Sequence, residues 1–313
     1  MRATTLKDAP EPQALGRQAR TLTRGAGDSI LTRMAQEAAK PQPARDKRTP
    51  PQSQEERSAI VNGFYAVLVF LGETTQLSLQ ALGTLFRGGV DLRDLIRQMA
   101  LVGADSVWIV LTITSATGAV FAFYTATFSL QIGFIEAVGG TLGYAFLNEL
   151  GPVLGGVAFA SRAGAAIAAE IGSMVVTEQV DALRAMAVSP IRYLVLPRVL
   201  AAVLMLPLLI VLADIAGLFG GYIFAGIKGI PPALFVDSVL KYTQAVDLIR
   251  GLIKAVCFAL IVGIVSCQQG LSTTGGATGV GRSTTNSVVL CVVLIFVADF
   301  FLAQILTQQV TSR

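Results

Sequence analysis

Charged residues cluster in the middle of an otherwise apolar chain. The stretch AEIGSMVVTEQVDALRAMAVSPIRYLVLPR, residues 169–198, begins among small apolar residues and then carries five charged side chains: Glu178, Asp181, Arg184, Arg192 and Arg198. The chain contains no histidine, which excludes His-based catalytic triads and most zinc sites.

The same stretch has helical periodicity. Val176, Val180, Leu183 and Ala187 recur every three or four residues and predict one apolar stripe, with the charged side chains on the remaining surface. Pro190 prevents a smooth continuation into the next apolar segment. A short amphipathic helix is therefore predicted. Such a helix either caps a helical bundle or docks into a groove on a soluble partner, and periodicity alone leaves both open.

A second polar site interrupts an apolar run further upstream. Asn148 and Glu149 lie within a stretch that otherwise suits a membrane helix. An intramembrane carboxylate is a candidate functional group because it is costly to place there. The alternative is that Glu149 ties neighbouring helices together, since buried polar groups commonly pair.

Three further charged residues are predicted to be structural. Arg162 and Glu170 lie eight residues apart, about two helical turns, so both can face the same neighbouring helix near the cytoplasmic end. We expect satisfied salt bridges at these two residues and at Asp299, with a gating role as the alternative.

The composition is typical of an integral membrane protein. Of 313 residues, 53% are hydrophobic and 14% are charged, and the mean hydropathy is +0.65, whereas soluble domains are about a quarter charged. Residues 1–57 hold 11 of the 24 basic and 7 of the 20 acidic residues, so the whole net charge of +4 lies there. This basic tail is predicted to be disordered and cytoplasmic. It lacks the apolar core of a signal peptide, and its acidic residues argue against a transit peptide.

Five stretches are long and apolar enough to cross a bilayer, which requires about 20 residues. They are residues 104–130, 140–170, 199–226, 250–270 and 285–308. Residues 58–86 are interrupted by Glu73 and by the polar residues that follow it, so an interfacial or re-entrant helix is predicted there. The predicted fold class is therefore an all-α polytopic membrane protein with about five transmembrane helices.

Basic residues near helix ends predict the orientation of the chain. They precede the first span and recur in the 171–198 loop, whereas the loop at 131–139 has none. The N-terminus and the 171–198 loop are therefore placed in the cytoplasm, and five spans place the C-terminus outside. Four basic residues near the outer side oppose this assignment: Lys228, Lys241, Arg250 and Lys254.

Small residues mark positions where helices can approach one another. Gly151 and Gly155 lie four residues apart, as do Gly217 and Gly221. This spacing lets the backbones of two membrane helices come close together. The alternative for each pair is that glycine is simply common in membrane spans.

One long run carries a family resemblance. The sequence NELGPVLGGVAFASRAGAAIAAEIGSMVVTEQVDALRAMAVSPIRYLVLPRVLA, residues 148–201, closely resembles the signature region of the MlaE/YrbE/TGD1 permease family. The similarity extends from RQMALVGADS at 97–106 to GVGRSTTNSVVLCVVLIFVADFFLAQIL at 279–306. The elements E-L-x-P, A-E-I-G and T-E-Q-x-D-A-L recur in order, which makes the signal specific. Members of this family are membrane subunits of ABC transporters that move lipids together with MCE-domain proteins.

The resemblance implies an architecture and a set of partners. Residues 58–313 would form a five-span permease domain with an interfacial N-terminal helix, and two copies would form a homodimer. VTEQVDALRAM would be the coupling helix that sits on a cytoplasmic ATPase, with these contact residues: Thr177, Glu178, Asp181, Leu183 and Arg184. An MCE-domain protein and a phospholipid are the other expected partners, and no nucleic acid is expected.

The ATPase is expected to be a separate chain, because no G-x-x-x-x-G-K-[ST] loop occurs here. The permease itself is therefore expected to be non-catalytic and to hold no metal or cofactor, with ATP and Mg²⁺ bound by the ATPase. The host membrane implied by the resemblance is a bacterial inner membrane, with a plastid inner envelope as the alternative.

The resemblance also implies a lipid cavity at the dimer axis. Asn148 and Glu149 of the E-L-G-P element would line it, and alignment with the family places Phe121, Ile132 and Leu150 on its wall. Some family members carry arginine where this chain has Asn148, so the resemblance does not carry a direct headgroup charge contact to that position.

Two other function classes compete with a lipid-transporting ABC permease. An ion-coupled secondary transporter would usually show an internal repeat, and the two halves of this sequence show no convincing similarity. An intramembrane enzyme is disfavoured by the absence of histidine and of a G-x-S-x-G element. The ABC permease is therefore the leading prediction.

Overall fold

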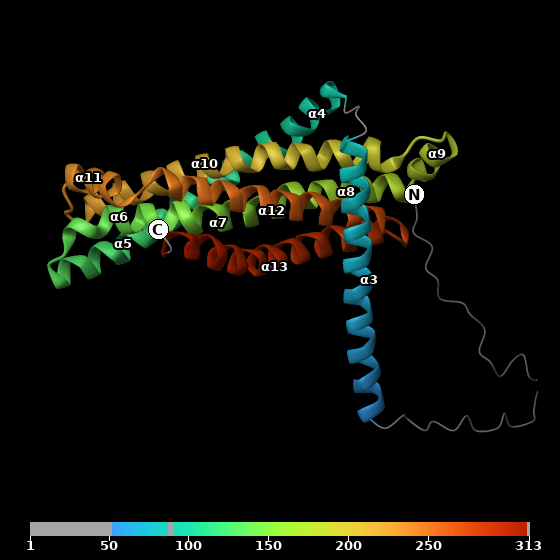
Figure 1. Cartoon of the computed structure of the whole chain (residues 1–313), viewed down its shortest axis with the longest axis horizontal. Coiled ribbons are helices and arrows are strands. Elements are labelled where there is room, and N and C mark those ends of the chain that lie inside the picture. The colour runs from blue at the N-terminus through green and yellow to red at the C-terminus, as the bar shows by residue number, and fades with distance from the viewer. Residues whose placement is uncertain (1–51, 87–90, 312–313) are drawn as a thin grey trace, which may run out of the picture. The chain divides into compact units, whose positions relative to one another are not determined.

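Every element described by the structure, a computed structural model covering residues 52–86 and 91–311, is a helix (Figure 1). The chain divides into two units, residues 1–63 and 64–313. Its α-helices are α3 (Gln52–Phe86), α4 (Leu92–Met99), α5 (Asp105–Ile132), α6 (Val138–Ala145), α7 (Gly151–Phe159), α8 (Ala165–Val176), α9 (Gln179–Ala185), α10 (Leu196–Ile227), α11 (Pro232–Tyr242), α12 (Ala245–Leu271) and α13 (Gly276–Thr311). The predicted all-α fold class is confirmed.

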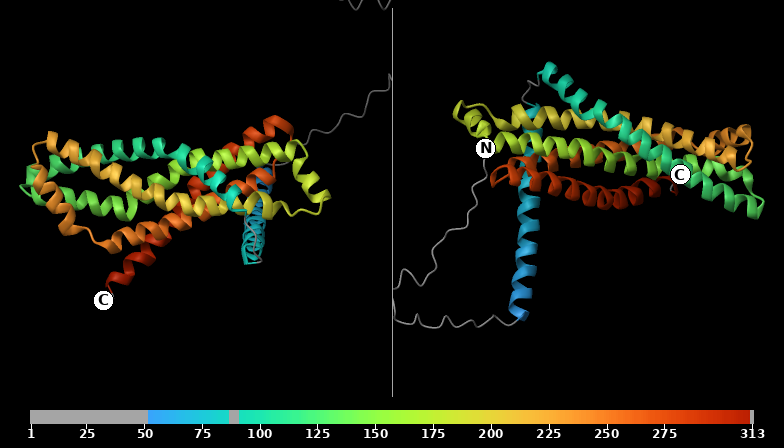
Figure 2. Two further views of the ribbon diagram at one scale, coloured as in Figure 1. Left: turned by 90° about the horizontal axis from the view of Figure 1, so that it is seen from above. Right: turned by 180° about the vertical axis from the view of Figure 1, so that it is seen from behind.

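Five segments of the described chain are long and apolar enough to cross a membrane. They comprise Leu92–Ile132, Ile135–Val176, Ile191–Ile227, Ala245–Leu271 and Gly276–Leu306, and they run alongside one another in two directions of view (Figure 2). The prediction of five spans is confirmed. Each helix is longer than its apolar core because it continues into polar flanks. α13, for example, begins in the sequence GATGVGRST, ahead of the predicted start at residue 285.

The N-terminal region is described from Gln52 onward. Residues 1–51 of the predicted tail lie outside the described residues, whereas residues 52–57 already belong to α3. α3 is not among the five membrane-crossing segments, and its place at the membrane interface stays a prediction. Glu73, the residue that interrupts its apolar sequence, accepts a hydrogen bond of 2.7 Å from the side chain of Gln268 in α12.

Wide helical turns of the π type, five residues long, interrupt three of the spans. They are η1 (Ala100–Ala104), η3 (Phe146–Leu150), η4 (Ala160–Gly164) and η5 (Ile191–Val195), and a 3-10 turn, η2 (Ile135–Ala137), follows α5. Pro152 and Pro197 each lie two residues after a π turn. Proline has no N–H and clashes in a regular helix with the carbonyl four residues back. Widening the preceding turn relieves that clash, which explains η3 and η5.

Glycine brings the first and third spans into backbone contact. A Cβ atom at Gly118 of α5 would strike the backbone of Gly217, and one at Gly220 of α10 would strike the backbone carbonyl of Ser115. Lipid supplies little hydrophobic drive between helices, so association depends on such close packing. The tight contact expected at Gly217 is therefore present.

A second seam joins the second and third spans. It consists of three glycines and the side chains on which they pack: Gly151 on Asp214, Gly155 on Ile210, and Gly221 on Leu142. Each glycine leaves room for a large or polar side chain from the facing helix. The two glycine pairs singled out in the sequence thus both lie at helix contacts.

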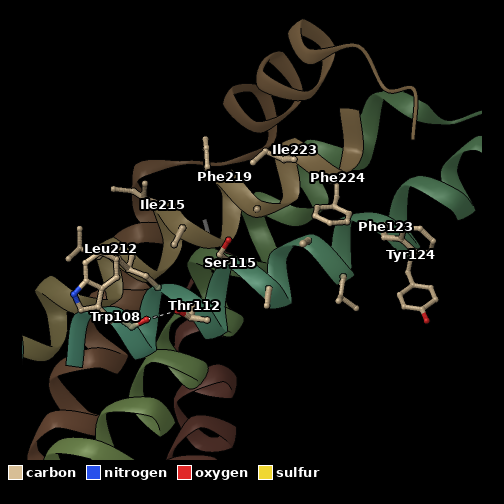
Figure 3. A pocket seen from close by; sticks show the side chains of 16 residues that line it. Trp108, Thr112, Ser115, Phe123, Tyr124, Leu212, Ile215, Phe219, Ile223 and Phe224 are labelled. Atoms are coloured by element: carbon tan, nitrogen blue, oxygen red, sulfur yellow. Dashed lines mark hydrogen bonds between the residues drawn. The ribbon is translucent and has the colours of Figure 1, made fainter. Parts of the chain in front are cut away.

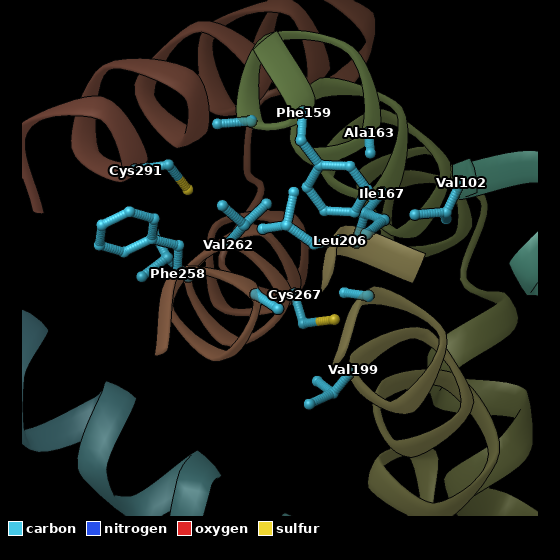
Figure 4. Packing of buried hydrophobic residues seen from close by; sticks show 14 of the residues in the cluster. Val102, Phe159, Ala163, Ile167, Val199, Leu206, Phe258, Val262, Cys267 and Cys291 are labelled. Carbon is cyan, nitrogen blue, oxygen red and sulfur yellow. The ribbon is translucent and has the colours of Figure 1, made fainter. Parts of the chain in front are cut away.

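All five spans contribute to the main apolar core (Figure 4). Val102, Phe159, Leu206, Phe258 and Cys291 come from successive spans and are buried together. Dense contact of this kind provides the dispersion attraction that holds helices together inside lipid.

The charged residues predicted to be structural are paired. Arg162 donates to Asp105 at 3.1 Å, and Arg198, which is buried, pairs with Glu170 at 2.9 Å. Arg198 also donates to the backbone carbonyl of Leu194 at 2.7 Å. The predicted salt bridges are confirmed, but a single common neighbour is wrong. Asp105 lies in the first span and Arg198 in the third. The prediction assumed a regular helix from Arg162 to Glu170, whereas Arg162 lies in the wide turn η4, which alters the helical spacing.

We predict that Gly220→Val strongly destabilises the fold, because its side chain would collide with the backbone of α5. Forcing extra atoms into a packed contact costs about 1–3 kcal/mol or more. The measurement is the thermal unfolding midpoint of the detergent-solubilised chain. Gly226→Val is the matched control, since it lies in the same helix with open space around it. Equal midpoints for the two variants would contradict the proposed backbone contact.

Candidate functional site

A buried lysine holds two carboxylates from two other spans. The Nζ atom of Lys254 in α12 lies 2.6 Å from Oε2 of Glu149 in η3 and 2.8 Å from Oδ1 of Asp299 in α13. The second, fourth and fifth spans are thereby joined at one point. We call these three residues the charge cluster.

Burial differs sharply among the members of the charge cluster. The side chain of Lys254 is 2% exposed and that of Asp299 is 17% exposed, whereas that of Glu149 is 44% exposed. A buried ammonium is tolerated in an apolar bundle only when it is paired. The lysine therefore serves the packing of the bundle, and Glu149 presents the cluster at a surface.

The wide turn η3 determines where Glu149 and Asn148 point. Asn148 is buried, and its Nδ2 atom donates to the backbone carbonyl of Tyr144 at 3.1 Å. Glu149, the next residue, points to Lys254 instead. The two residues predicted to line one cavity thus have different surroundings in the single chain, one satisfied within its own helix and the other facing a charged partner.

The other predicted cavity residues lie in two places. Phe121 and Leu150 both pack against an apolar cluster built around Leu142 and Phe146. Ile132, the last residue of α5, is exposed. The next residue, Gly133, adopts a left-handed conformation with φ of 74° and ends the helix. Phe121 and Leu150 thus pack on the same apolar cluster, which does not include Ile132, and a common cavity in a dimer stays a prediction.

A large apolar groove lies elsewhere, between α5 and α10 (Figure 3). Its volume is about 1030 Å³, and none of the predicted cavity residues lines it. Its walls carry large side chains that include Trp108, Phe123, Phe219 and Phe224. The glycine contacts bring the backbones of α5 and α10 close together at the bottom of the groove, and large aromatic side chains form its sides.

The predicted amphipathic helix is present as α9. It is bounded by Glu178 and Ala187, whose φ angles of 59° and 57° are left-handed. The chain therefore turns sharply at both ends of α9, and Glu178 breaks the helical register after α8. The predicted continuous apolar stripe from residue 176 to 187 is wrong for this reason, since the pattern assumed one unbroken helix.

The side chains around α9 fall into a buried and an exposed set. Val180 is buried and Leu183 is half-buried within the chain, whereas four predicted coupling residues are exposed: Thr177, Glu178, Asp181 and Arg184. Arg184 and Asp181 form an ion pair of 2.8 Å, which contributes at most about 1 kcal/mol at such exposure. Met186, which the sequence pattern did not single out, is 64% exposed.

Comparison with known proteins agrees with this architecture. The family described as Permease MlaE matches residues 95–305. The chain belongs to the MlaE permease family. Its match reaches into all five spans and includes the charge cluster and α9.

Individual relatives of this MlaE-family chain come from bacteria and from a chloroplast. A probable ABC transporter permease protein of Synechocystis sp. is 41% identical over 225 residues, which cover 72% of this chain and 86% of that protein. A probable ABC transporter permease protein of Rickettsia felis is 37% identical, with 75% and 91% covered. Protein TRIGALACTOSYLDIACYLGLYCEROL 1, chloroplastic, of Arabidopsis thaliana is 35% identical, with 72% and 64% covered. The chain is thus a multi-span ABC transporter permease.

The main residue that sequence reasoning missed in this MlaE-family chain is Lys254. Its position near a helix end groups it with the outer basic residues that oppose the predicted orientation, although it stands inside the apolar run GLIKAVCFAL. A lysine with apolar residues on both sides in the sequence was the available signal. Because Lys254 is buried and paired, it is not a loop residue and does not bear on orientation.

Lys254→Met is predicted to destabilise the chain, because it leaves the carboxylates of Glu149 and Asp299 without their cation. Breaking a buried pair costs about 3 kcal/mol, the lower end of the usual range, since Glu149 is partly exposed. The thermal unfolding midpoint in detergent measures this effect. Lys241→Met, which removes an exposed lysine in α11, is the control. A midpoint unaffected by Lys254→Met would mean that the charge cluster does not hold the three spans together.

Proposed function

We propose that this permease lies in a bacterial inner membrane and moves phospholipid or a related lipid between membranes. It works as a homodimer with a separate cytoplasmic ATPase, which binds ATP and Mg²⁺, and with an MCE-domain protein. The name of the Arabidopsis relative refers to a glycolipid, which supports lipid as the substrate class.

The exposure of Glu149 is the observation that carries the proposal. Its carboxylate is held by a buried lysine yet reaches the surface of an otherwise apolar bundle. A lipid needs an apolar surface for its chains and a polar contact for its headgroup. One polar anchor among apolar side chains provides both, as ligand sites commonly do.

The exposed face of α13 supports the homodimer. Among the five spans, α13 has the smallest buried share. Large apolar side chains recur along it at helical spacing: Val289, Val293, Phe296 and Phe300. Asp299 of the same helix belongs to the charge cluster. A second copy packed on α13 would therefore lie next to Glu149 and would enclose a lipid there.

Assembly is tested by purifying the full chain from its host membrane in mild detergent. We expect two copies of the permease, two ATPase chains that carry a G-x-x-x-x-G-K-[ST] loop, and an MCE oligomer. In proteoliposomes this complex should move lipid only while ATP is hydrolysed. A monomer without an ATPase chain, or lipid movement that needs an ion gradient and no ATP, would contradict the proposal and favour a secondary transporter.

Glu149→Lys is predicted to reduce lipid transport by about tenfold or more, which corresponds to about 1.4 kcal/mol. The new ammonium would face that of Lys254, and like charges in contact repel. Glu149→Gln keeps the size and a hydrogen-bonding oxygen, so it should retain more activity. The assay is ATP-dependent lipid transfer by the reconstituted complex. Loss of the folded permease in both variants would instead assign Glu149 to structure alone.

Substitutions in and beside α9 are predicted to release the ATPase or to uncouple ATP hydrolysis from lipid movement. Leu183→Asp should do so, but Leu183 is half-buried within the chain, so this variant also perturbs the fold. Met186→Asp is the cleaner test, because Met186 is exposed and one central apolar anchor contributes about 2 kcal/mol or more. Asp181→Lys should act more weakly and with stronger salt dependence, since exposed charges are screened.

ATPase co-purification and lipid-stimulated turnover in nanodiscs measure coupling for each variant. If Met186→Asp and Leu183→Asp each keep wild-type ATPase co-purification and wild-type lipid-stimulated turnover, then α9 only caps the bundle.

A further inference from the structure

A buried carboxyl group in the third span has no partner among the described residues. Asp214 lies within α10 and is 3% exposed. Both of its carboxyl oxygens are enclosed, and neither accepts a hydrogen bond from a group in the described part of the chain. The ion pairs formed by the described residues likewise do not include it. Asp214 is thus distinct from the charge cluster, in which each carboxylate faces a lysine.

The surroundings of Asp214 identify the element that it supports. Its Oδ1 atom packs on the Cα of Gly151, where a Cβ atom would collide with it. The backbone carbonyl of Phe146 lies beside the same point, 3.0 Å from that Cβ position. Phe146 and Gly151 stand at the two ends of the wide turn η3, whose closing hydrogen bond runs from the N–H of Gly151 to the carbonyl of Phe146. The side chain therefore packs on Gly151, one of the two residues whose hydrogen bond closes η3.

An ionised carboxylate does not suit this place. Moving a charge from water into an apolar interior without a partner is far more costly than burying a neutral polar group. A neutral carboxylic acid has one O–H donor, and a backbone carbonyl has two lone pairs. The carbonyl of Phe146 uses one lone pair for Gly151, so the second is available to the acid.

We infer that Asp214 is a neutral acid that holds the wide turn η3 in place and thereby directs Glu149 toward Lys254. Asp214 is thus a positioning residue for the lipid contact, a role that rests on the function proposed above. Its importance follows from Pro152, which cannot donate a hydrogen bond to the turn before it. η3 packs against both α10 and α12. Asp214 in α10 can therefore affect the contact that Glu149 of η3 makes with Lys254 in α12.

The consequence of losing this support is geometric. A regular helix advances by about 100° per residue, and a wide turn accommodates one extra residue. If η3 reverted to a regular helix, Glu149 would rotate away from Lys254 by about that angle. Pro152 already disfavours a regular helix here, and the side chain of Asp214, which fills the space left open by the missing side chain of Gly151, holds the turn in place.

The protonation state is tested by infrared spectroscopy of the purified full chain at neutral pH. The difference spectrum of wild type minus Asp214→Asn should contain the C=O band of a protonated carboxyl group. A difference spectrum with only carboxylate bands would show that Asp214 is ionised and would overturn the inference.

The positioning role is tested by chemical labelling, which does not depend on lipid transport. The three native cysteines are replaced by alanine, and Glu149→Cys reports on η3 through its rate of reaction with a maleimide. Asp214→Ala should change that rate by about fivefold, the equivalent of about 1 kcal/mol, whereas Asp214→Asn, which has the same shape and remains neutral, should leave it unchanged. Ser173→Cys in α8, which is exposed, is the reference reporter and should not respond.

Two controls separate positioning from general loosening of the bundle. Thr114→Val removes a buried hydroxyl of α5 that binds its own helix, and it should leave the rate at position 149 unchanged. Equal effects of Asp214→Ala at positions 149 and 173, or no effect at either, would overturn the inference. So would an Asp214→Asn variant that behaves like Asp214→Ala.

Lipid transport provides a separate readout for the same variants. Asp214→Ala should lower ATP-dependent lipid transfer in parallel with the change at position 149, and Asp214→Asn should restore it. Altered labelling in a chain that moves no lipid would contradict the proposed function while leaving the positioning role intact. Unaltered labelling in a chain that does move lipid would overturn the positioning role while leaving the proposed function intact.

Discussion

The pairing of Lys254 is the interaction on which the arrangement of the spans depends. An ammonium group with almost no exposure has to meet opposite charge inside the bundle, and the carboxylates come from the second and fifth spans. Three helices far apart in the sequence are therefore fixed to one point. Where helices meet through side chains, apolar packing alone leaves their relative positions adjustable, because several registers bury similar surfaces. A charged contact with a short range selects one register, and Glu149 gains a defined direction as a result.

Helix number and type could be predicted from the sequence, because an apolar run of sufficient length has few alternatives in a membrane. Gly151 and Gly155 could also be assigned to a helix contact, since their spacing places both on one face. The contact partners could not be predicted. That Asp214 faces Gly151, or that Lys254 faces Glu149, depends on how separate helices are rotated and shifted relative to one another, and no local pattern contains this information.

The wide turns set a further limit on prediction. Periodicity arguments assume an unbroken spacing of 3.6 residues per turn, whereas η3 and η4 alter that spacing inside one span. Asn148 and Glu149 consequently point to different surroundings, although neighbours in a motif suggest a shared role. The same assumption failed at Glu178, where a non-glycine residue adopts a left-handed conformation. Such a residue is uncommon enough that composition gives no warning of it.

The contact between α5 and α10 also restricts how this protein can move. Two helices separated by side chains slide past one another as rotamers adjust, but Gly118 and Gly217 leave no side chain between the backbones, and Gly220 packs directly against the backbone carbonyl of Ser115. A shift along this seam would drive main-chain atoms into each other. We therefore expect the first and third spans to move together. Any rearrangement that opens a path for cargo has to take place at contacts built from deformable side chains, such as those made by α13.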